Sequence, residues 1–455
     1  MITKKPNIIF FVMDALRARN LRCYGYKRNT SPNIDSLAKN GILFSNFFST
    51  NNSTDNSLMS ILSGRHILKE NTFYSNMQDS LFYTKQELKS FFDSGGIFLQ
   101  EILKKNNYKT YCLKYIHGWQ KRGFDYYFKE GSAKPIKKTK NILNSLRKHK
   151  TLFNILQKLY HLSSSKFITC HLAARKIKNR LKYPIDERAT NEAISIIKKN
   201  KGKENFFMWV DYADTHMPYN PSKFVGKFGN HSNVVENVIA KYDEAIFYND
   251  YLIGKIIKTL KEEKLFDNTI IFFFSDHGES LNEHQIYFDH HGPYDVSFNP
   301  PLIIHNKNLS TKKIDVLTQL EDITPTILDF IGIKYNPSLF DGETLLPLIE
   351  NRKSKIRDSI ILEEGYLGTK TILRTEKYKY MEAKSKKDAK CIKCNKIHGG
   401  IIELYDLEKD PDEKTNIAKK NKKLLIEMKM KLDKEIKNIK TTNEKRRLNN
   451  ILSKI

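Results

Sequence analysis

Cysteine is scarce in this sequence: only five occur among its 455 residues, an odd number with just one close pair. Such a set gives no framework of paired disulfides, the device that small secreted domains use for stability. Long apolar runs are also missing, because no uninterrupted stretch approaches the ~20 residues that a helix needs to cross a bilayer. The apolar segment 7–13 is too short for a signal peptide, and Asp14 interrupts it. We therefore expect a soluble, cytoplasmic protein.

Acidic residues are outnumbered: 51 Asp and Glu face 78 Lys and Arg, for a formal net charge of +27. This excess favours anionic partners, among them phosphorylated or sulfated molecules and anionic membrane surfaces. Nucleic acid fits the same charge, but no nucleic-acid-binding motif is found, so we expect no specific nucleic-acid partner. Hydrophobic residues make up 40% of the chain, which is ordinary for a globular protein and excludes disorder throughout.

Short apolar runs alternate with charged, helix-patterned stretches along the first 350 residues. The clearest runs span residues 7–13, 110–116, 206–210, 269–275 and 302–305. This alternation predicts an α/β fold in which helices flank a central mixed sheet whose strands are mainly parallel.

The character of the sequence changes after residue 350. Strand-like pieces predict a small antiparallel sheet, at residues 360–363, 371–374, 378–381 and 401–405. A Lys-rich helix is expected from about residue 411. We therefore divide the chain into an α/β domain over residues 1–350 and a C-terminal subdomain over residues 351–455. A basic, helix-patterned insertion at about 134–201 is expected to pack on the first domain, with contact to an anionic membrane as the alternative.

Polar groups follow four of the predicted strands within a few residues: Asp14 the first, His117 the second, His216 the third, and Asp276 with His277 the fourth. Ligands of open α/β sheets bind beyond the carboxyl ends of the strands, so we expect these side chains to converge at one edge. Asp14, Asp276 and His277 offer carboxylate and imidazole ligands for a divalent cation. The alternative is a pair of loop residues, with Asp276 capping a helix.

A hydroxyl-rich turn at residues 53–57 opens an apolar helix that is expected to end at Gly64. A hydroxyl at a helix N-terminus beside a cation has its alkoxide stabilised by the helix dipole and the metal, as a nucleophile for an anionic ester requires. Thr54 is the candidate, and its alternative role is that of the helix N-cap. His216 and His290 are candidates to balance charge on such an ester or to protonate its leaving group.

Cys391 and Cys394 form the one close cysteine pair, and His398 follows four residues later. Together they supply three of the four ligands of a structural zinc site, remote from any catalysis. A tight turn with two free thiols is the alternative interpretation.

Taken in order, these motifs resemble the sulfatase family of the alkaline phosphatase superfamily, from residue 6 to about residue 418. PNIIFFVMDALRARNLRCYGY resembles the family's N-terminal signature, whose Asp binds metal, and FFFSDHGESLNEH resembles its second metal motif. DTHMPY resembles the His-x-Pro substrate motif, and counting back five residues from Asp295 places His290 where the family has a substrate-contacting Lys. The resemblance implies a sulfatase-like mixed sheet flanked by helices, with a small C-terminal antiparallel sheet and helix.

The family's nucleophile segment ends in a Leu-Leu-Thr-Gly-Arg-like run, and counting back from residues 61–65 (ILSGR) places Thr54 at the nucleophile. Sulfatases with Cys-x-Pro-x-Arg there oxidise the Cys, or a Ser, to formylglycine. Thr54 cannot become that aldehyde and Leu58 replaces the Arg, so no formylglycine is expected; Ser53 serves only with a one-residue slip. The similarity to phosphoethanolamine and phosphoglycerol transferases of the superfamily implies instead a Thr nucleophile and a metal site of Asp14, Thr54, Asp276 and His277.

Further departures from the family pattern bear on the metal. Sulfatases usually have two adjacent Asp after the first strand, whereas Ala15 follows Asp14 here, and His277 stands where many have Asn. An imidazole ligand favours Mn²⁺ or Zn²⁺, with Ca²⁺ or Mg²⁺ as alternatives. Sulfatases also have Lys-Trp-His after the second strand. This chain has Tyr115, Ile116 and His117 at those positions, so only the His is retained.

We therefore expect a metal-dependent phosphodiesterase or phosphotransferase that acts through Thr54 on an anionic small-molecule, glycan or lipid-linked ester. An arylsulfatase-like sulfuric ester hydrolase is the first alternative. The second is an inactive sulfatase-like domain that binds an anionic glycan or lipid surface through its basic insertion.

Overall fold

A mixed sheet forms the centre of the computed structural model, which describes residues 5–67, 85–114, 118–128, 185–219, 221, 223–229, 231–365, 369–391 and 396–452. Its strands lie in the order β5-β4-β6-β1-β7-β8-β2-β9. They are β1 (Asn7–Met13), β2 (Ile42–Phe44), β4 (Lys109–Leu113), β5 (Tyr126–Tyr127), β6 (Phe206–Tyr212), β7 (Thr269–Phe274), β8 (Leu302–His305) and β9 (Lys312–Ile314). β1 pairs in parallel with β6 and β7, whereas β8 is antiparallel to β7 and β2. The predicted mixed sheet is confirmed.

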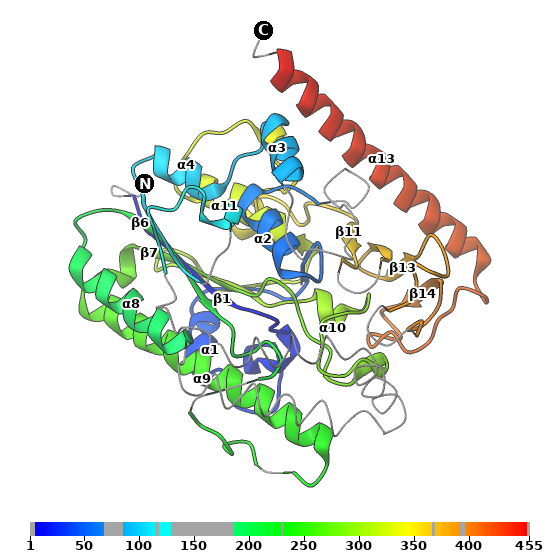
Figure 1. Ribbon diagram of the computed structural model, residues 1–455, viewed down its shortest axis with the longest axis horizontal. Helices are drawn as coiled ribbons and strands as arrows, with labels where there is room; N and C mark the ends of the chain where they lie inside the picture. The colour runs from blue at the N-terminus through cyan, green and yellow to red at the C-terminus, as the bar shows by residue number, and fades with distance from the viewer. Residues whose placement is uncertain are drawn as a thin grey trace, which may run out of the picture.

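Helices cover both faces of this sheet, so the body has three layers (Figure 1). On one face lie α1 (Pro32–Lys39), α8 (Ile185–Asn200) and α9 (Val234–Glu262). On the other lie α2 (Thr54–Ser63), α3 (Lys85–Asp93), α4 (Leu99–Lys105) and α11 (Ile323–Phe330). Short helical segments connect these elements: η1 (Ala18–Asn20), η2 (Arg22–Tyr24), η4 (Gly118–Lys121), η5 (Phe266–Asn268), η6 (Glu283–Gln285), α10 (Asp295–Phe298), η7 (Leu320–Asp322), η8 (Pro337–Leu339) and α12 (Leu346–Ile349).

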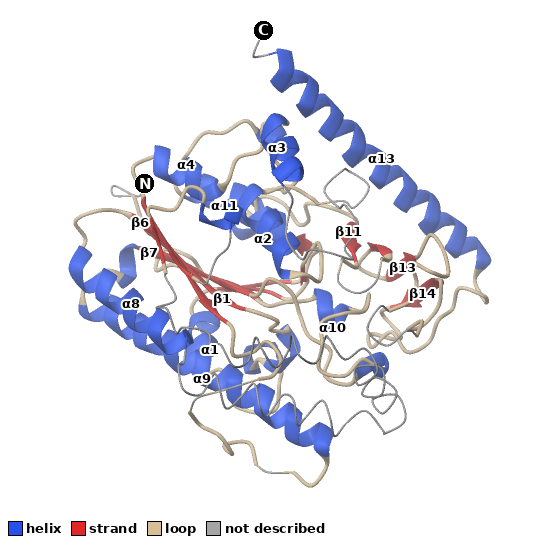
Figure 2. Cartoon of the chain, viewed as in Figure 1, coloured by secondary structure: helices blue, strands red, loops and turns tan. Residues whose placement is uncertain are grey.

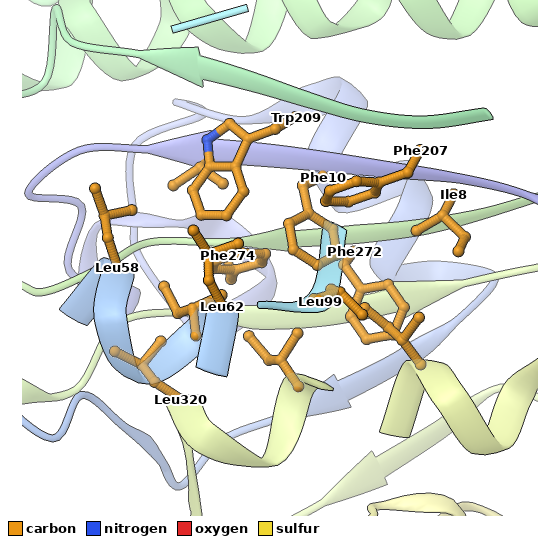
Figure 3. Packing of buried hydrophobic residues seen from close by; sticks show 14 of the residues in the cluster. Ile8, Phe10, Leu58, Leu62, Leu99, Phe207, Trp209, Phe272, Phe274 and Leu320 are labelled. Carbon is orange, nitrogen blue, oxygen red and sulfur yellow. The ribbon is translucent and has the colours of Figure 1, made fainter. Parts of the chain in front are cut away.

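β1 is buried along its whole length, which explains why its sequence is continuously apolar instead of alternating. Successive side chains of a strand point to opposite faces, so Ile8, Phe10 and Val12 enter one core while Ile9 and Phe11 enter the other. Figure 3 shows the first of these cores. The ring of Phe10 lies between 5.0 and 5.6 Å, centroid to centroid, from four other rings: Phe207, Trp209, Phe272 and Phe274.

The predicted small antiparallel sheet is also present, set beside the central one (Figure 2). Its strands follow one another in order: β11 (Ile360–Glu363), β12 (Thr371–Arg374), β13 (Tyr378–Glu382) and β14 (Ile402–Asp406). One face packs with the body around Phe48, and the other is covered by α13 (Lys422–Leu452), through Met428 and Leu432. A further pair joins β3 (Phe47–Phe48) to β10 (Thr318–Gln319). The division of the chain at residue 350 stays a prediction.

The prediction that the last helix begins near residue 411 is wrong, because α13 begins only at Lys422. The preceding residues form turns instead. The carboxylate of Asp410 accepts from the N–H groups of Lys414 and Thr415, and the N–H of Ile417 donates to the carbonyl of Leu404 on β14 at 2.8 Å. These long-range and turn bonds compete successfully with helix formation.

Part of the predicted basic insertion belongs to the body. Ala189, Ala193 and Ile197 of α8 pack into the core beneath β6, beside α9. Residues 129–184 lie outside the described residues, as do residues 115–116 of the predicted second strand and His117 after it. Among the residues that are described, no helix combines the length and apolar character needed to span a membrane.

Replacing Phe10 by Ala removes the ring at the centre of the aromatic cluster, and we expect the free energy of unfolding to fall by about 3–5 kcal/mol. Chemical denaturation measures this loss. The control is Ile426→Ala on α13, because the side chain of Ile426 is 60% exposed. That variant should change stability by less than about 0.5 kcal/mol. Equal losses in the two variants would contradict the central position of β1.

Candidate active site

The carboxyl ends of β1 and β7 place two acids side by side. The two strands are parallel neighbours, and Asp14 and Asp276 follow them at the same edge of the sheet. The backbone turns sharply after Asp14: Ala15 has a φ of 59°, and its N–H donates to Asp276 Oδ1 at 3.3 Å. The N–H of His277 donates to the same oxygen at 3.0 Å. One oxygen of Asp276 is therefore held by backbone donors, which fixes the orientation of the carboxylate.

His277 completes this cluster with a defined tautomer. Its Nδ1 lies 2.9 Å from the carbonyl oxygen of Gly278, and since a carbonyl can only accept, Nδ1 carries the hydrogen. In the neutral ring the lone pair is then on Nε2, which lies 3.6 Å from both Asp14 Oδ1 and Asp276 Oδ2. Asp14, Asp276 and His277 each offer one ligand atom, all within 4.8 Å of one another. The structure thus brings together the two acids and the imidazole that the sequence singled out.

Thr54 lies at the same cluster as the first residue of α2, and its Oγ1 is 3.2 Å from His277 Nε2. Ser53, not Thr54, occupies the N-cap position, so the alternative role of Thr54 as N-cap is wrong. The hydroxyl of Ser53 instead donates to Asn51 Oδ1 at 2.9 Å and accepts from Asn56 Nδ2 at 2.6 Å. The hydroxyl that lies against His277 is therefore that of Thr54.

The rest of α2 explains why this hydroxyl is well placed. The helix ends where predicted, at Gly64, whose φ of 62° lets its N–H donate to the carbonyl of Ser60 at 2.9 Å. Leu58 is buried in the hydrophobic core together with Leu62. The apolar face of α2 thus anchors the helix, and its N-terminus points Thr54 toward the acids.

Two of the predicted imidazoles lie beside the cluster. The ring of His290 stacks on that of His277 with centroids 4.3 Å apart, and His216 lies edge-on to His290 at 5.4 Å. His290 Nδ1–H donates to the carbonyl of Asn52 at 2.6 Å. Burial, with the neighbouring imidazoles, lowers the pKa of His290 well below its usual value, so this ring is neutral at pH 7. His117 lies outside the described residues, and its role stays a prediction.

Sequence reasoning missed a partly buried cation at this edge. Lys114 directly follows β4, and its Nζ donates to Asp211 Oδ2 on β6 at 2.9 Å. Burial lowers the pKa of Lys114, but Asp211, Asp14 and Asp276 outweigh that effect and raise it above its usual value. A Lys therefore does lie here, one residue before Tyr115, the position that aligns with the Lys of the sulfatase Lys-Trp-His motif. A lone cation inside the otherwise apolar run 110–116 is the signal that could have identified it.

The predicted zinc ligands Cys391, Cys394 and His398 are brought together only in part. Cys391 and His398 do lie together, and their third neighbour is His291, which the sequence did not assign. Cys394 lies outside the described residues, so its part in a zinc site stays a prediction. The ligand atoms of His291, Cys391 and His398 all lie within 4.8 Å of one another.

The donor set of the first cluster fits a divalent cation. Asp14 Oδ1 and Asp276 Oδ2 are buried and accept no hydrogen bond within the described part of the chain, a costly arrangement for a carboxylate. Burial raises the pKa of Asp14, but His216, His277 and Lys114 outweigh it and leave the pKa below its usual value. An ionised, buried carboxylate with an uncommitted oxygen is the donor that a metal ion requires.

Two family profiles match this chain. Residues 6–333 match the sulfatase family, and residues 282–442 match the profile described as N-sulphoglucosamine sulphohydrolase, C-terminal. An arylsulfatase of Clostridium perfringens (strain 13 / Type A) is 26% identical, over 91% of this chain and 90% of its own length. The N-acetylgalactosamine-6-sulfatase of Homo sapiens is 26% identical over 61% of this chain, which spans 50% of that relative's length.

Solved structures show the same fold at lower identity. The phosphonate monoester hydrolase of Agrobacterium radiobacter superimposes with a TM-score of 0.65 and 18% identity, covering 96% of this chain and 96% of its own. Identity at that level supports the fold alone.

A divalent cation should stabilise the protein, because it relieves the repulsion between the two buried carboxylates. We expect Mn²⁺ at 100 times its Kd to raise the free energy of unfolding by about 2.7 kcal/mol. Asp276→Asn should remove most of that gain, whereas Asp267→Asn, at an exposed ion pair with Lys307, should keep it. Thermal denaturation with and without Mn²⁺ measures the effect. An undiminished gain in Asp276→Asn would contradict a cation at this cluster.

Proposed function

The chain belongs to the sulfatase family, and from that premise we propose that it is a metal-dependent enzyme acting on phosphate- or sulfate-type esters through Thr54. The transferred group would pass from an anionic ester to Thr54 and then to water or an acceptor alcohol. One observation carries this proposal: Thr54 Oγ1 lies 3.2 Å from His277 Nε2, at a helix N-terminus beside the buried Asp276 and the partly buried Asp14.

Asp14, Asp276 and His277 would hold the cation, with Thr54 as a further ligand. A bound divalent cation lowers the pKa of a coordinated hydroxyl and offsets negative charge on the group being transferred. A mixed oxygen and imidazole set suits Mn²⁺ or Zn²⁺ better than Ca²⁺. An inactive binding domain would have no need to keep these side chains in one buried cluster, so their juxtaposition supports an enzyme.

In the proposed reaction Thr54 Oγ1 attacks phosphorus or sulfur in line with the leaving oxygen. The N-terminus of α2 and the partly buried cation Lys114 add positive potential at the point where negative charge develops. His216 and His290 would face the ester oxygens. Because Nδ1 of His290 is bonded to a backbone carbonyl, this ring meets the substrate through Nε2 and takes up a proton there before it can donate one.

Phosphorus is the favoured electrophile because the nucleophile is a threonine. Formylglycine forms from Cys or Ser, and the one adjacent Ser, Ser53, has its hydroxyl held between two amide side chains and not at His277. Without the aldehyde hydrate, the covalent intermediate on Thr54 has to be released by attack on the transferred atom itself. Phosphoryl transfer proceeds by such in-line displacement, which favours a phosphodiesterase or phosphotransferase.

Sulfuric ester hydrolysis is the second candidate, and the relatives favour it. The relative that aligns with 91% of this chain is named an arylsulfatase, and the human relative is named for a sulfated sugar. A sulfated glycan would also satisfy the net charge of +27. This candidate requires that water attack the sulfur of a sulfated Thr54.

Thr54→Ala should lower kcat by about 10³-fold or more, since the residue forms the covalent intermediate. Bound metal, measured by elemental analysis, should remain near one equivalent at this cluster. Ser53→Ala is the matched control and should retain most of the activity, because its hydroxyl is directed away from the cluster. The reverse pattern, with Ser53→Ala inactive and Thr54→Ala active, would contradict the assignment of the nucleophile.

The identity of the transferred group is tested with a panel of esters at saturating Mn²⁺: an aryl sulfate, a phosphate monoester, a phosphodiester and a phosphonate ester. We expect the highest kcat/KM on a phosphorus ester, and an adduct on Thr54 in high-resolution intact-mass spectra that Thr54→Ala lacks. A clear preference for the aryl sulfate would replace the first candidate with the second. Turnover of none of the four, in metal-loaded protein, would contradict both.

A further inference from the structure

A second cluster of metal-type ligands lies outside the candidate active site. His291 precedes Cys391 by 100 residues and His398 by 107, yet the ligand atoms of all three lie within 4.8 Å of one another. The rings of His291 and His398 have centroids 5.5 Å apart. Both His291 and Cys391 are buried. Two imidazoles and a thiol so placed form a donor set that differs from the carboxylate-rich cluster at Asp14.

Backbone pairing fixes the segment that carries His291. Ser280 and Asp289 form an isolated antiparallel bridge and exchange both N–H···O bonds, at 3.0 and 3.1 Å. Two residues further on, the N–H of Gly292 donates to Glu364 Oε1 at 3.0 Å. His291 Nδ1 lies 3.2 Å from Asp289 Oδ1, so a carboxylate stands beside one ring nitrogen of the imidazole.

A second bridge fixes the segment that carries Cys391 and His398, between β13 and β14. Lys390 pairs with Ile397, and the N–H of Cys391 donates to the carbonyl of Lys396 at 2.9 Å. Because the bridge is antiparallel, Cys391 and His398 follow their partners in opposite directions, and both point to the face of the bridge opposite Lys390 and Ile397. Their ligand atoms lie within 4.8 Å of each other.

The ring of His398 is also held in a tautomer that suits a metal. Its Nδ1 lies 3.3 Å from the carbonyl oxygen of His284, which can only accept, so Nδ1 carries the hydrogen and Nε2 the lone pair. The carbonyl of His398 accepts from Lys370 Nζ at 2.9 Å, and Lys370 is in turn paired with the buried Glu403. Hydrogen bonds thus hold both the ring and the backbone carbonyl of His398.

We propose that His291, Cys391 and His398 form a second metal site, for Zn²⁺ or a cation of similar softness. Thiolate and imidazole ligands select Zn²⁺, whereas carboxylate and water ligands suit Ca²⁺ and Mg²⁺. Three protein ligands leave one position of a tetrahedral site for a further donor. The site would join the segment after Asp289, in the body, to the hairpin between β13 and β14. It depends on no step of the proposed reaction.

The competing interpretation is a thiol–imidazole hydrogen bond without any metal, since His291 and Cys391 are within hydrogen-bonding reach of each other. The two interpretations differ in stoichiometry. A metal site predicts one bound zinc that depends on Cys391 and is independent of Asp276. The hydrogen bond alone predicts no such equivalent.

The test uses the full chain, stripped with a chelator and reloaded with Co²⁺ as a spectroscopic substitute for Zn²⁺. Thiolate-bound Co²⁺ gives a charge-transfer absorption in the near ultraviolet, which carboxylate and imidazole ligands do not. We expect this band in the wild type and in Asp276→Asn, and its loss in Cys391→Ser. Elemental analysis after loading with Zn²⁺ should show one equivalent fewer in Cys391→Ser than in the wild type.

Cys23→Ser is the matched control, because Cys23 is a partly buried thiol elsewhere in the fold, and it should keep both the band and the zinc. His398→Gln provides a second variant in case Cys391→Ser does not fold, which circular dichroism establishes. It should shift the visible cobalt bands and lower the affinity for zinc by about 10-fold or more. Absence of the charge-transfer band in the wild type, or its persistence in Cys391→Ser, would overturn the proposal.

Discussion

The buried pairing of β1 between β6 and β7 is the interaction on which the site depends. Both ladders are parallel, so the carboxyl ends of three strands meet at one edge. The pairing continues past the strand itself, because the N–H of Asp14 donates to the carbonyl of Tyr212 at 2.8 Å. A shift of register by one residue would turn the side chains of β1 out of two separate cores. The register of β1 therefore fixes where Asp14 lies relative to Asp276.

Concentrated negative charge is the consequence of this geometry. Burial disfavours the ionised form of a carboxylate, yet the pKa of Asp14 is lowered, because His216, His277 and Lys114 outweigh the effect of burial. The neighbouring cation and imidazoles keep the carboxylate charged although most of its side chain is removed from water. A metal ion binds only the deprotonated ligand, so this electrostatic environment prepares the cluster for a cation. The repulsion between the carboxylates of Asp14 and Asp276 acts at one edge of an otherwise apolar sheet.

Features with a local signature could be predicted from the sequence, and features that depend on distant partners could not. The apolar run before Asp14 and the helix that opens at Thr54 both have local patterns, and the structure confirms the strand and the helix. Lys114 escaped notice because its partner Asp211 is 97 residues away. His291 was missed for the same reason, since only the fold brings it to the cysteine hairpin. The start of the last helix was misplaced because a backbone bond to β14, invisible in the sequence, holds Ile417 outside it.

The two adjacent imidazoles His290 and His291 face different neighbours. Both follow Asp289, which is paired with Ser280 in an isolated bridge. The ring of His290 stacks on that of His277 with centroids 4.3 Å apart, while the ring of His291 lies beside that of His398, with centroids 5.5 Å apart. A cation at the proposed thiol site would fix the backbone of His291 and, through one peptide unit, the orientation of His290. Coupling between the C-terminal hairpin and the ring of His290 would thus run through the one peptide unit that joins His290 to His291.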